Sequence, residues 1–226
     1  MSKIIKNVVI IGASSGIGKE LAIQFAQLGC NVRISARREE LLKEVANENP
    51  SKIEYSIFDV NELNSISTNL LNIFKSLDTI DLIIFSSAFG KRNPQLDIQI
   101  EEETLKTNVA AFTIIADFCY NYITSRGDNT IFASITSIAG IRGWGISPAY
   151  SASKSYQSVY LEALRQRANN QKSKIHVVEI CPGFVDTQMG QGSGVFWRSS
   201  AKKAAKQIIN SINKSKRVIY ITKRWR

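Results

Sequence analysis

A phenol and an ammonium that could exchange protons stand four residues apart, at Tyr150 and Lys154. In a helix this spacing places both side chains on one face. A free tyrosine has a pKa near ~10, which is too high for efficient proton transfer at neutral pH. An ammonium about 4 Å away, at an effective dielectric constant of about 20, favours the phenolate by ~4 kcal/mol, or about three pKa units. The pair therefore predicts a proton-exchanging phenol, although the spacing alone also arises by chance.

Two further polar residues are expected to reach the same cleft. Ser137 follows a predicted strand at its carboxyl end, where the ligands of open α/β sheets bind, and precedes Tyr150 by thirteen residues. Asn108 lies in a long helical segment, and we interpret it as a buried amide with a functional role. The alternative for Asn108 is an asparagine on the helix surface.

A glycine-rich segment lies between the first predicted strand and the first predicted helix. Glycine allows a tight turn and a close approach of backbone N–H groups to a phosphate, and the helix N-terminus adds partial positive charge. The segment therefore predicts a dinucleotide-binding loop, with a glycine turn that binds no ligand as the alternative. The expected cofactor-binding residues are Gly12, Ser14, Ser15, Gly16, Ile17 and Gly18.

In such folds, the residue that binds the adenosine ribose lies about 20 residues after the loop, and in an NAD site it is Asp or Glu. This chain carries Arg37 and Arg38 there. Two arginines at a helix start oppose the helix dipole by ~0.3–1 kcal/mol each. A 2′-phosphate would reverse the sign, since charge-assisted hydrogen bonds contribute about 1.5–3 kcal/mol each. We therefore expect NADP(H) to be preferred over NAD(H), with a solvated surface pair as the alternative.

Short apolar runs alternate with stretches of helical period along the chain, which predicts a parallel sheet with helices on both faces. The expected strands are 7–11, 31–35, 53–58, 81–85, 130–135, 174–180 and 218–221. The expected helices run from the glycine loop to residue 28 and over 39–48, 62–76, 100–125, 150–169 and 201–212. Because no repeat or linker interrupts this pattern, residues 1–226 are expected to form one doubly wound, Rossmann-type α/β domain.

Length and composition exclude several other classes of protein. The 226 residues are 44% hydrophobic, which suits one α/β domain and excludes wholesale disorder. No apolar run reaches the length of about 18 residues that a membrane helix needs, and the first residues show no signal-peptide pattern. Cys30, Cys119 and Cys181 lack metal-ligand spacing, so we expect no metal site and reduced, buried thiols of a cytoplasmic protein.

The net charge of +10 is concentrated late in the chain, since Asp186 is the last acidic residue and ten of the 29 basic residues follow it. The neutral remainder argues against a nucleic-acid-binding face. Lys202, Lys203 and Lys206 fall on the polar side of an amphipathic helix, which favours solvated surface charge. The alternative is a peripheral contact of residues 223–226 with an anionic membrane or an acidic carrier protein.

Taken together, these motifs resemble those of the short-chain dehydrogenase/reductase family, in the same order and over nearly the full length of the chain. The family's Gly-x-x-x-Gly-x-Gly pattern matches Gly12, Gly16 and Gly18. Its four catalytic residues match Asn108, Ser137, Tyr150 and Lys154. By the same resemblance, further cofactor-binding positions are Asp59, Val60, Ala88, Tyr150, Lys154, Pro182, Gly183, Val185 and Thr187.

The resemblance implies an NADP(H)-dependent oxidoreductase that interconverts a carbonyl and an alcohol. Tyr150 would be the general acid in reduction and the general base in oxidation, while Lys154 would lower its pKa and hold the nicotinamide ribose. Ser137 would hydrogen-bond the substrate oxygen, and Asn108 would hold a water that links Lys154 to solvent. The hydride would come from the cofactor. The alternative is a non-catalytic NADP-binding regulator or scaffold, although such a protein would have no need of all four residues.

Three departures from the family pattern concern the cofactor and the assembly. Ile11 replaces the usual threonine before the first glycine, and Ser-Ser-Ala-Phe at 86–89 replaces Asn-Asn-Ala-Gly, which weakens the hydrogen bonds expected behind the cofactor. In the family a glycine-rich C-terminal segment often forms the tetramer interface, and this chain has Lys-Arg-Trp-Arg at that place. The resemblance implies a homodimer through the two long helices, with a tetramer as the alternative. The expected outer-face residues are Phe112, Ile115, Phe118, Tyr122, Tyr156, Tyr160 and Leu164.

Residues 183–199 resemble the family's substrate loop. The segment combines three glycines with two bulky aromatic residues, namely Gly190, Gly192, Gly194, Phe196 and Trp197. Mobile glycines and aromatic rings suit a lid over an apolar carbonyl or alcohol substrate, and the alternative is that the rings only anchor the loop. We interpret His176, which lies in a predicted strand, as a packed core residue and not as a catalyst.

Overall fold

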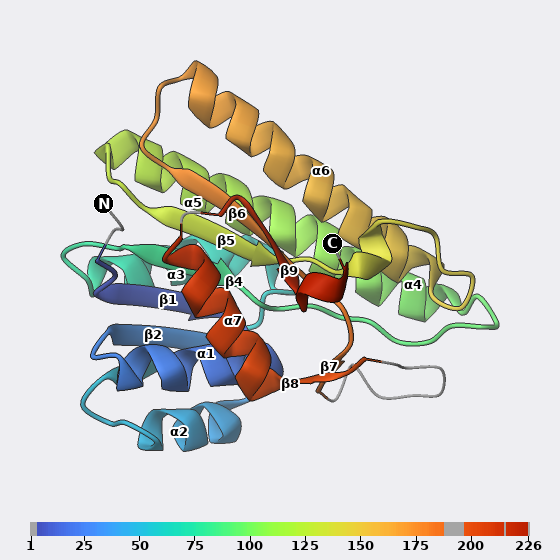
Figure 1. The fold of residues 1–226 in the computed structure, drawn as a ribbon, viewed down its shortest axis with the longest axis horizontal. Helices are drawn as coiled ribbons and strands as arrows, with labels where there is room; N and C mark the ends of the chain where they lie inside the picture. Colours follow the sequence, from blue (N-terminus) through green and yellow to red (C-terminus); the bar gives the residue numbers. More distant parts are fainter. Residues whose placement is uncertain (1–3, 188–196, 215, 226) are drawn as a thin grey trace.

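The computed structural model describes residues 4–187, 197–214 and 216–225. The main sheet has seven parallel strands in the order β3-β2-β1-β4-β5-β6-β9 (Figure 1). They are β1 (Asn7–Ile11), β2 (Asn31–Ala36), β3 (Ile53–Ile57), β4 (Leu82–Phe85), β5 (Ile131–Ile135), β6 (His176–Pro182) and β9 (Val218–Ile221). The doubly wound fold class and the number and direction of the strands are thus confirmed.

Helices cover both faces of this sheet and bury its central strands (Figure 1). One apolar layer packs under α1 (Gly16–Gln27), α2 (Glu39–Asn47) and α7 (Ala201–Ile212). The other packs under α3 (Ile66–Lys75), α5 (Phe112–Arg126) and α6 (Pro148–Asn170). Every residue of β4 and β5 is buried, as expected for strands covered on both faces.

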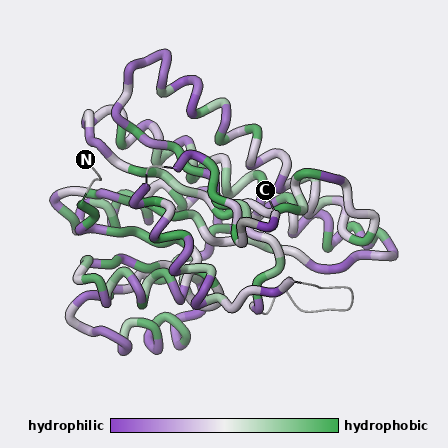
Figure 2. The backbone as a smooth tube through the Cα atoms, in the orientation of Figure 1, coloured by the Kyte–Doolittle hydropathy of each residue, from purple (hydrophilic) through white to green (hydrophobic). Residues whose placement is uncertain are grey.

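The hydrophobic pattern explains why these segments form helices with one buried side. In α7 the apolar residues recur at helical spacing and are buried, whereas Lys202, Lys203 and Lys206 are exposed. Apolar residues follow the strands, and polar residues follow the outer sides of the helices (Figure 2). The solvated placement of these three lysines is therefore confirmed.

The strand order reverses between β1 and β4, because one half of the sheet grows outward from each of these two strands. In open α/β sheets, ligands bind in the crevice outside the carboxyl ends of the strands at such a reversal. The loop from β1 to α1 and the segment after β4 leave the sheet at this edge. The fold therefore brings the glycine loop to the expected ligand crevice.

The long helix expected over 100–125 is interrupted in its middle. It consists of α4 (Ile98–Leu105), a π-helical turn η2 (Lys106–Ala111) and α5. Single π turns inside helices are rare and are found mostly at functional sites. The prediction of one continuous helix was therefore wrong at the turn that contains Asn108.

The sequence reading also missed a small pair of parallel strands, β7 (Val185–Asp186) and β8 (Ser199–Ser200). They lie apart from the main sheet, and each is only two residues long. Strands this short leave no periodicity to read in a sequence. Residues 188–196 of the expected substrate loop, which include Gly190, Gly192, Gly194 and Phe196, lie outside the described residues.

Two interpretations of side-chain placement need correction. His176 is exposed at the start of β6, because it lies at the strand end that precedes the buried centre. Phe112, Ile115 and Leu164 do not lie on an outer helix face, because they are buried in the layer between α5, α6 and the sheet. The other expected outer-face residues, Phe118, Tyr122, Tyr156 and Tyr160, are partly exposed.

Candidate active site

The glycine loop packs directly against the end of β4. Gly12 has a φ of 93°, and a Cβ at this position would lie 2.5 Å from the backbone nitrogen of Ser87. Its own backbone N–H donates to the Ser35 carbonyl at 2.7 Å. Any larger residue would push the first turn away from the sheet, so glycine is required at Gly12. Gly16 and Gly18 begin α1, in which Ile17 packs against the apolar layer.

Arg38 reaches from the end of β2 to this loop. Its Nη2 donates to the Ser14 hydroxyl at 2.8 Å and to the Ser15 hydroxyl at 2.8 Å, and its Nε lies 3.3 Å from the Ser14 oxygen. Arg37 turns the other way, and its guanidinium lies 3.7 Å from the Asp59 carboxylate. Of the two arginines, Arg38 is bonded to the glycine loop, and Arg37 is paired with Asp59.

The segments after β3 and β4 complete this half of the crevice. The Asp59 carboxylate accepts the backbone N–H of Asn61 at 2.9 Å, and Val60 is buried beside it. Ala88 is half-buried after β4. The next residue, Phe89, is held at both backbone groups by the Asn108 amide, which accepts at 2.9 Å and donates at 2.7 Å. This clamp orders the segment in which the chain departs from the family pattern.

Asn108 is fully buried in the π turn, so the surface alternative for this residue is excluded. Its side-chain nitrogen also donates to the Ser153 hydroxyl of α6 at 3.0 Å. Its backbone carbonyl accepts from Nε2 of Gln157, also on α6, at 2.8 Å. Asn108 therefore joins the segment after β4 to the helix that carries Tyr150.

The first turn of α6 is fixed by its neighbours. Pro148 occupies the first helical position, where its missing N–H has no consequence. The Glu101 carboxylate of α4 accepts the backbone N–H of Ala149 at 2.9 Å and the Asn93 amide at 2.6 Å. These contacts set where Tyr150, one residue later, enters the crevice.

Ser137 and Tyr150 meet at the carboxyl end of β5. The Ser137 side chain caps the short helical turn η3 (Ile138–Gly140), accepting from the backbone of Ala139 at 3.1 Å. Burial raises the pKa of Tyr150, and the nearby Ser137 hydroxyl partly opposes this effect. The turn that was expected to return Ser137 to the same cleft as Tyr150 is therefore present.

Lys154 is almost fully buried one turn after Tyr150. Its Nζ donates to the Ile135 carbonyl at 3.1 Å and to Oε1 of Gln157 at 2.9 Å, and it lies 5.8 Å from the centre of the Tyr150 ring. Burial lowers the pKa of Lys154 to about 7. Phenol and ammonium thus share one face of α6, as their spacing predicted.

The electrostatic expectation for this pair was wrong in one respect. We expected the ammonium to lower the pKa of the Tyr150 phenol, whereas that pKa lies above its ordinary value. The reason is that burial disfavours both charged forms: it raises the pKa of the phenol and lowers the pKa of the ammonium.

The segment after β6 runs past the start of α1. Pro182 ends β6, Val185 is buried in β7, and the Thr187 methyl group lies beside Gly16 at the start of α1. The Trp225 indole covers Gly183, where any side chain would collide with it. The expected positions for the nicotinamide therefore line a wall that runs from β6 to the glycine loop.

Four aromatic rings gather on this wall. Trp225, in the turn η5 (Lys223–Trp225), lies 5.8 Å from Phe184 and 5.5 Å from Trp197, and Phe184 lies 5.7 Å from Trp144. Phe184 and Trp197 fall within the expected substrate loop 183–199, whereas Trp144 and Trp225 come from two other segments that only the fold brings to it.

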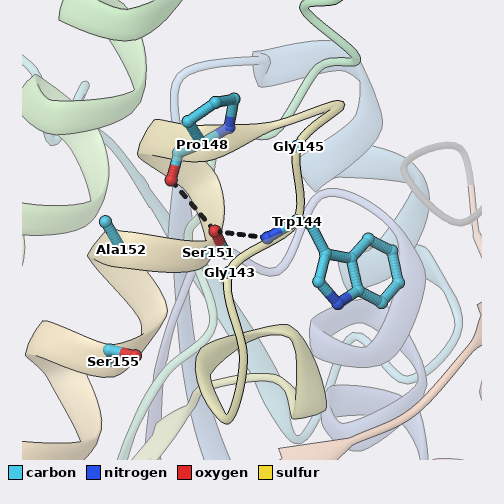
Figure 3. A pocket seen from close by; sticks show the side chains of 7 residues that line it. All are labelled: Gly143, Trp144, Gly145, Pro148, Ser151, Ala152 and Ser155. Atoms are coloured by element: carbon cyan, nitrogen blue, oxygen red, sulfur yellow. Dashed lines mark hydrogen bonds between the residues drawn. The ribbon is translucent and has the colours of Figure 1, made fainter.

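A shallow cavity of about 340 Å³ lies on the neighbouring flank of α6 (Figure 3). It is lined by Gly143, Trp144, Gly145, Pro148, Ser151, Ala152 and Ser155. The Ser151 hydroxyl ties its rim together, because it accepts from the Trp144 backbone at 3.2 Å and donates to the Pro148 carbonyl at 3.0 Å. The cavity adjoins the loop between Ser137 and Tyr150, but neither residue lines it.

The family model for short chain dehydrogenases matches residues 6–195 of the chain. The chain belongs to the short-chain dehydrogenase family. This short-chain dehydrogenase is 29% identical over 195 residues to a dehydrogenase/reductase SDR family protein 7-like from Dictyostelium discoideum, and the match covers 81% of the chain and 60% of that relative. It is 28% identical over 191 residues to an NADP-dependent 3-hydroxy acid dehydrogenase from Schizosaccharomyces pombe, with coverage of 81% and 73%.

Solved structures share the fold of this short-chain dehydrogenase. An actinorhodin polyketide ketoreductase with NADPH superposes with a TM-score of 0.84 at 19% identity, covering 96% of this chain and 95% of that one. The structure of ElxO with NADP bound gives 0.80 at 20% identity, with coverage of 96% and 97%. Within the described ranges of the short-chain dehydrogenase, no helix is long and apolar enough to cross a membrane. The same residues hold no cluster of His, Cys, Asp and Glu suited to a metal ion.

Proposed function

We propose that this short-chain dehydrogenase is an NADP(H)-dependent oxidoreductase that interconverts a carbonyl and a primary or secondary alcohol. One observation carries the proposal: the Ser137 hydroxyl acts on the Tyr150 phenol at the carboxyl edge of the sheet, and the Lys154 ammonium lies 5.8 Å from the centre of the Tyr150 ring. A phenol, a hydroxyl and an ammonium that meet in the ligand crevice can bind and protonate a carbonyl oxygen. Family membership supports the same reaction class.

The residues of the chain fit a bound dinucleotide phosphate. The backbone of the glycine loop approaches the end of β4 so closely that a Cβ at Gly12 would fill the space. The Arg38 guanidinium is already held at the loop by two hydroxyls, so it needs little reordering to meet a 2′-phosphate. The NADP-dependent relative from Schizosaccharomyces pombe supports this cofactor choice.

In the proposed reduction, Tyr150 donates its phenolic proton to the carbonyl oxygen, and in oxidation it takes that proton back. Ser137 orients the oxygen by a hydrogen bond. Lys154 holds the nicotinamide ribose and supports the phenolate that forms after proton donation. Asn108 fixes the wall behind the cofactor through its bonds to Phe89. The cofactor supplies the hydride.

We further propose that the substrate is apolar near its reacting group. The Trp225 ring covers Gly183, the residue after Pro182, and the rings of Phe184, Trp197 and Trp144 follow from it in ring-to-ring contact. Aromatic walls with few polar groups suit ligands that bury apolar surface.

The protein is also proposed to be a cytoplasmic homodimer that binds no nucleic acid. Cys30, Cys119 and Cys181 are buried free thiols, which suit a reducing compartment. Contact of residues 223–226 with an anionic membrane or carrier protein stays a prediction, which co-sedimentation with anionic vesicles at low salt tests.

The deciding experiment follows the loss of NADPH absorbance with a panel of small ketones, aldehydes, acyl thioesters and steroids. We expect turnover on at least one apolar member, and we expect it to fall about a hundredfold or more in Tyr150→Phe with NADPH binding unchanged. NADPH binding without turnover on any member would favour the non-catalytic regulator instead. Equal turnover in Tyr150→Phe would contradict the proposed mechanism.

A further inference from the structure

Gln157 joins two groups of the proposed active site that lie on different elements. It sits on α6, three residues after Lys154, and its side chain is fully buried. Its Oε1 accepts from the Lys154 ammonium at 2.9 Å, while its Nε2 donates to the Asn108 backbone carbonyl at 2.8 Å. One amide therefore spans the distance from the ammonium to the π turn.

Both ends of this link are themselves fixed. The ammonium donates a second hydrogen bond to the Ile135 carbonyl at the end of β5, which leaves one of its three donors for a ligand. The Asn108 side chain is hydrogen-bonded to Phe89 and Ser153. The Asn108 backbone carbonyl, which accepts from Gln157, therefore has little freedom to move. In the short-chain dehydrogenase/reductase family that the sequence resembles, a water held by the residue matching Asn108 would contact the lysine. Here the Gln157 amide joins Lys154 and Asn108 directly.

An amide and a water differ in their ability to transfer protons. A water both donates and accepts through one oxygen, so it can take a proton on one side and release another elsewhere. The Gln157 amide accepts only at oxygen and donates only at nitrogen, and a proton could cross it only through an imidic acid form. It is therefore suited to hold the ammonium in place and poorly suited to carry protons.

We propose that Gln157 is a positioning residue of this enzyme, which ties the Lys154 ammonium to the Asn108 carbonyl through its own amide and favours the protonated form of Lys154. The proposal rests on the oxidoreductase function proposed above. A hydrogen bond to the charged form of a group favours that form, and this effect opposes the burial that lowers the pKa of Lys154 to about 7.

The other groups that face Lys154 are few. Tyr150 lies on the same face of α6, and Cys181 faces the ammonium from β6. Glu179 is the next charged group along that strand, where it faces Cys181 and lies 3.9 Å from Arg165. None of these groups changes in a substitution at Gln157, so a change in the titration of Lys154 reports on the amide.

The test uses Gln157→Met, which keeps the length of the side chain but removes both bonds, and Gln157→Glu, which keeps an acceptor and adds a negative charge. NMR titration of isotopically labelled lysine side chains follows Lys154, whose signal is assigned by its loss in Lys154→Arg. We expect the pKa of Lys154 to fall by about one unit or more in Gln157→Met and to rise by a similar amount in Gln157→Glu. In the reduction assay, the alkaline limb of kcat/KM should move in the same two directions.

Gln166 provides matched controls, because it is an exposed glutamine on the same helix. Gln166→Met and Gln166→Glu should leave the titration of Lys154 unchanged. Where Gln157→Met unfolds in a thermal scan, Gln157→Asn serves instead, because it is still polar but one methylene too short to span both groups, and its shift should again be downward.

An unchanged pKa of Lys154 in both Gln157 variants would overturn the proposal, as would equal shifts in the Gln166 variants. A purely structural role would lower stability without moving the titration in opposite directions for Met and Glu. The titration does not need a substrate, so a protein without turnover would contradict the proposed function and leave this result standing.

Discussion

The guanidinium of Arg38 donates to the hydroxyl of Ser14 at 2.8 Å, which ties the end of β2 to the loop that begins α1. This contact holds a cation beside the glycine loop in a defined orientation. Arg37, its neighbour, is exposed and only 3.7 Å from the Asp59 carboxylate, which partly neutralises it. The two arginines are therefore expected to differ in their effect on cofactor choice.

The first prediction concerns that choice. Arg38→Ala should weaken the binding of NADPH by ~2–3 kcal/mol. Arg37→Ala should weaken it by less, because only Arg38 is held at the loop. NADH, which lacks the 2′-phosphate, should bind nearly as before. Titration of both cofactors by fluorescence checks this, with Lys206→Gln on the exposed side of α7 as the control. If NADH weakens as much as NADPH, the arginines do not read the phosphate.

The second prediction concerns the phenol. Tyr150→Phe removes the proton donor but keeps the ring, so turnover should fall about a hundredfold or more while the affinity for NADPH stays the same. Tyr55→Phe is the matched control, because Tyr55 is exposed on the edge strand β3. Steady-state kinetics and cofactor titration on both variants separate chemistry from binding. A loss of NADPH affinity in Tyr150→Phe would point to a structural role for this phenol.

Much of the fold could be predicted from the sequence, because continuous apolar strands and amphipathic helices leave a clear periodic signal. The π turn around Asn108 could not be predicted, since a single extra residue per turn does not change the apolar pattern of a helix. The pair β7 and β8 was missed because two residues show no period. Phe112 and Ile115 were assigned to the wrong side, because α5 carries apolar residues on most of its surface.

The positions of Ser137, Tyr150 and Lys154 could be predicted because each lies next to a strand end or on one helix face. The role of Gln157 was missed, although its signal was present: a polar residue three positions after Lys154 lies on the same side of the helix. Trp144 and Trp225 left no such signal. They meet Phe184 and Gly183 only through contacts between segments far apart in the sequence.

The third prediction concerns stability against pH. An unfolded lysine keeps its pKa of 10.5, whereas burial lowers the pKa of Lys154 in the folded chain to about 7. Between these values the unfolded chain binds more protons, so the contribution of Lys154 to stability rises with pH, by at most about 1.4 kcal/mol per unit. Burying Lys154 therefore costs no stability at a pH above the unfolded pKa, and the cost grows as pH falls towards 7.

Lys154→Met isolates this effect. Urea unfolding at neutral and moderately alkaline pH should show the wild type gaining stability relative to Lys154→Met as pH rises. Burial also raises the pKa values of Tyr150 and Cys181, and both residues are present in both proteins. Lys206→Met, at an exposed lysine, should show no such trend. A flat difference for Lys154→Met would mean that the folded protein does not depress this pKa.

The fourth prediction concerns assembly. Phe118 and Tyr122 stack on α5, Tyr156 and Tyr160 stack on α6, and Val159 beside them is 67% exposed. A dimer through these helices would bury Val159, so Val159→Lys should shift the protein towards monomer. Leu28→Lys, at the C-cap of α1 and at 64% exposure, is the matched control and should leave the assembly unchanged. Light scattering at micromolar concentration checks both, and a monomeric wild type would reject the proposed dimer.

The last prediction tests whether Trp225 forms part of the site wall. The Trp225 indole covers Gly183 so closely that a methyl group there has no room. Gly183→Ala should therefore destabilise the protein by about 1–3 kcal/mol, as overpacking does, and should displace the ring. In the Trp225→Ala background the same substitution should cost much less, because the obstructing ring is gone.

A double-mutant cycle measures this coupling directly, since the interaction energy is the part of the cost that disappears with the ring. The unfolding free energies of the four proteins give the coupling of Gly183 and Trp225 in stability. The KM values of the four proteins for an apolar substrate give the coupling of the same two residues in substrate binding. If Trp225 belongs to the wall, both Gly183→Ala and Trp225→Ala raise KM, and the double variant is no worse than the poorer single one. Additive costs in both measurements would mean that Trp225 and Gly183 act independently, and Trp225 would then have no place in the wall.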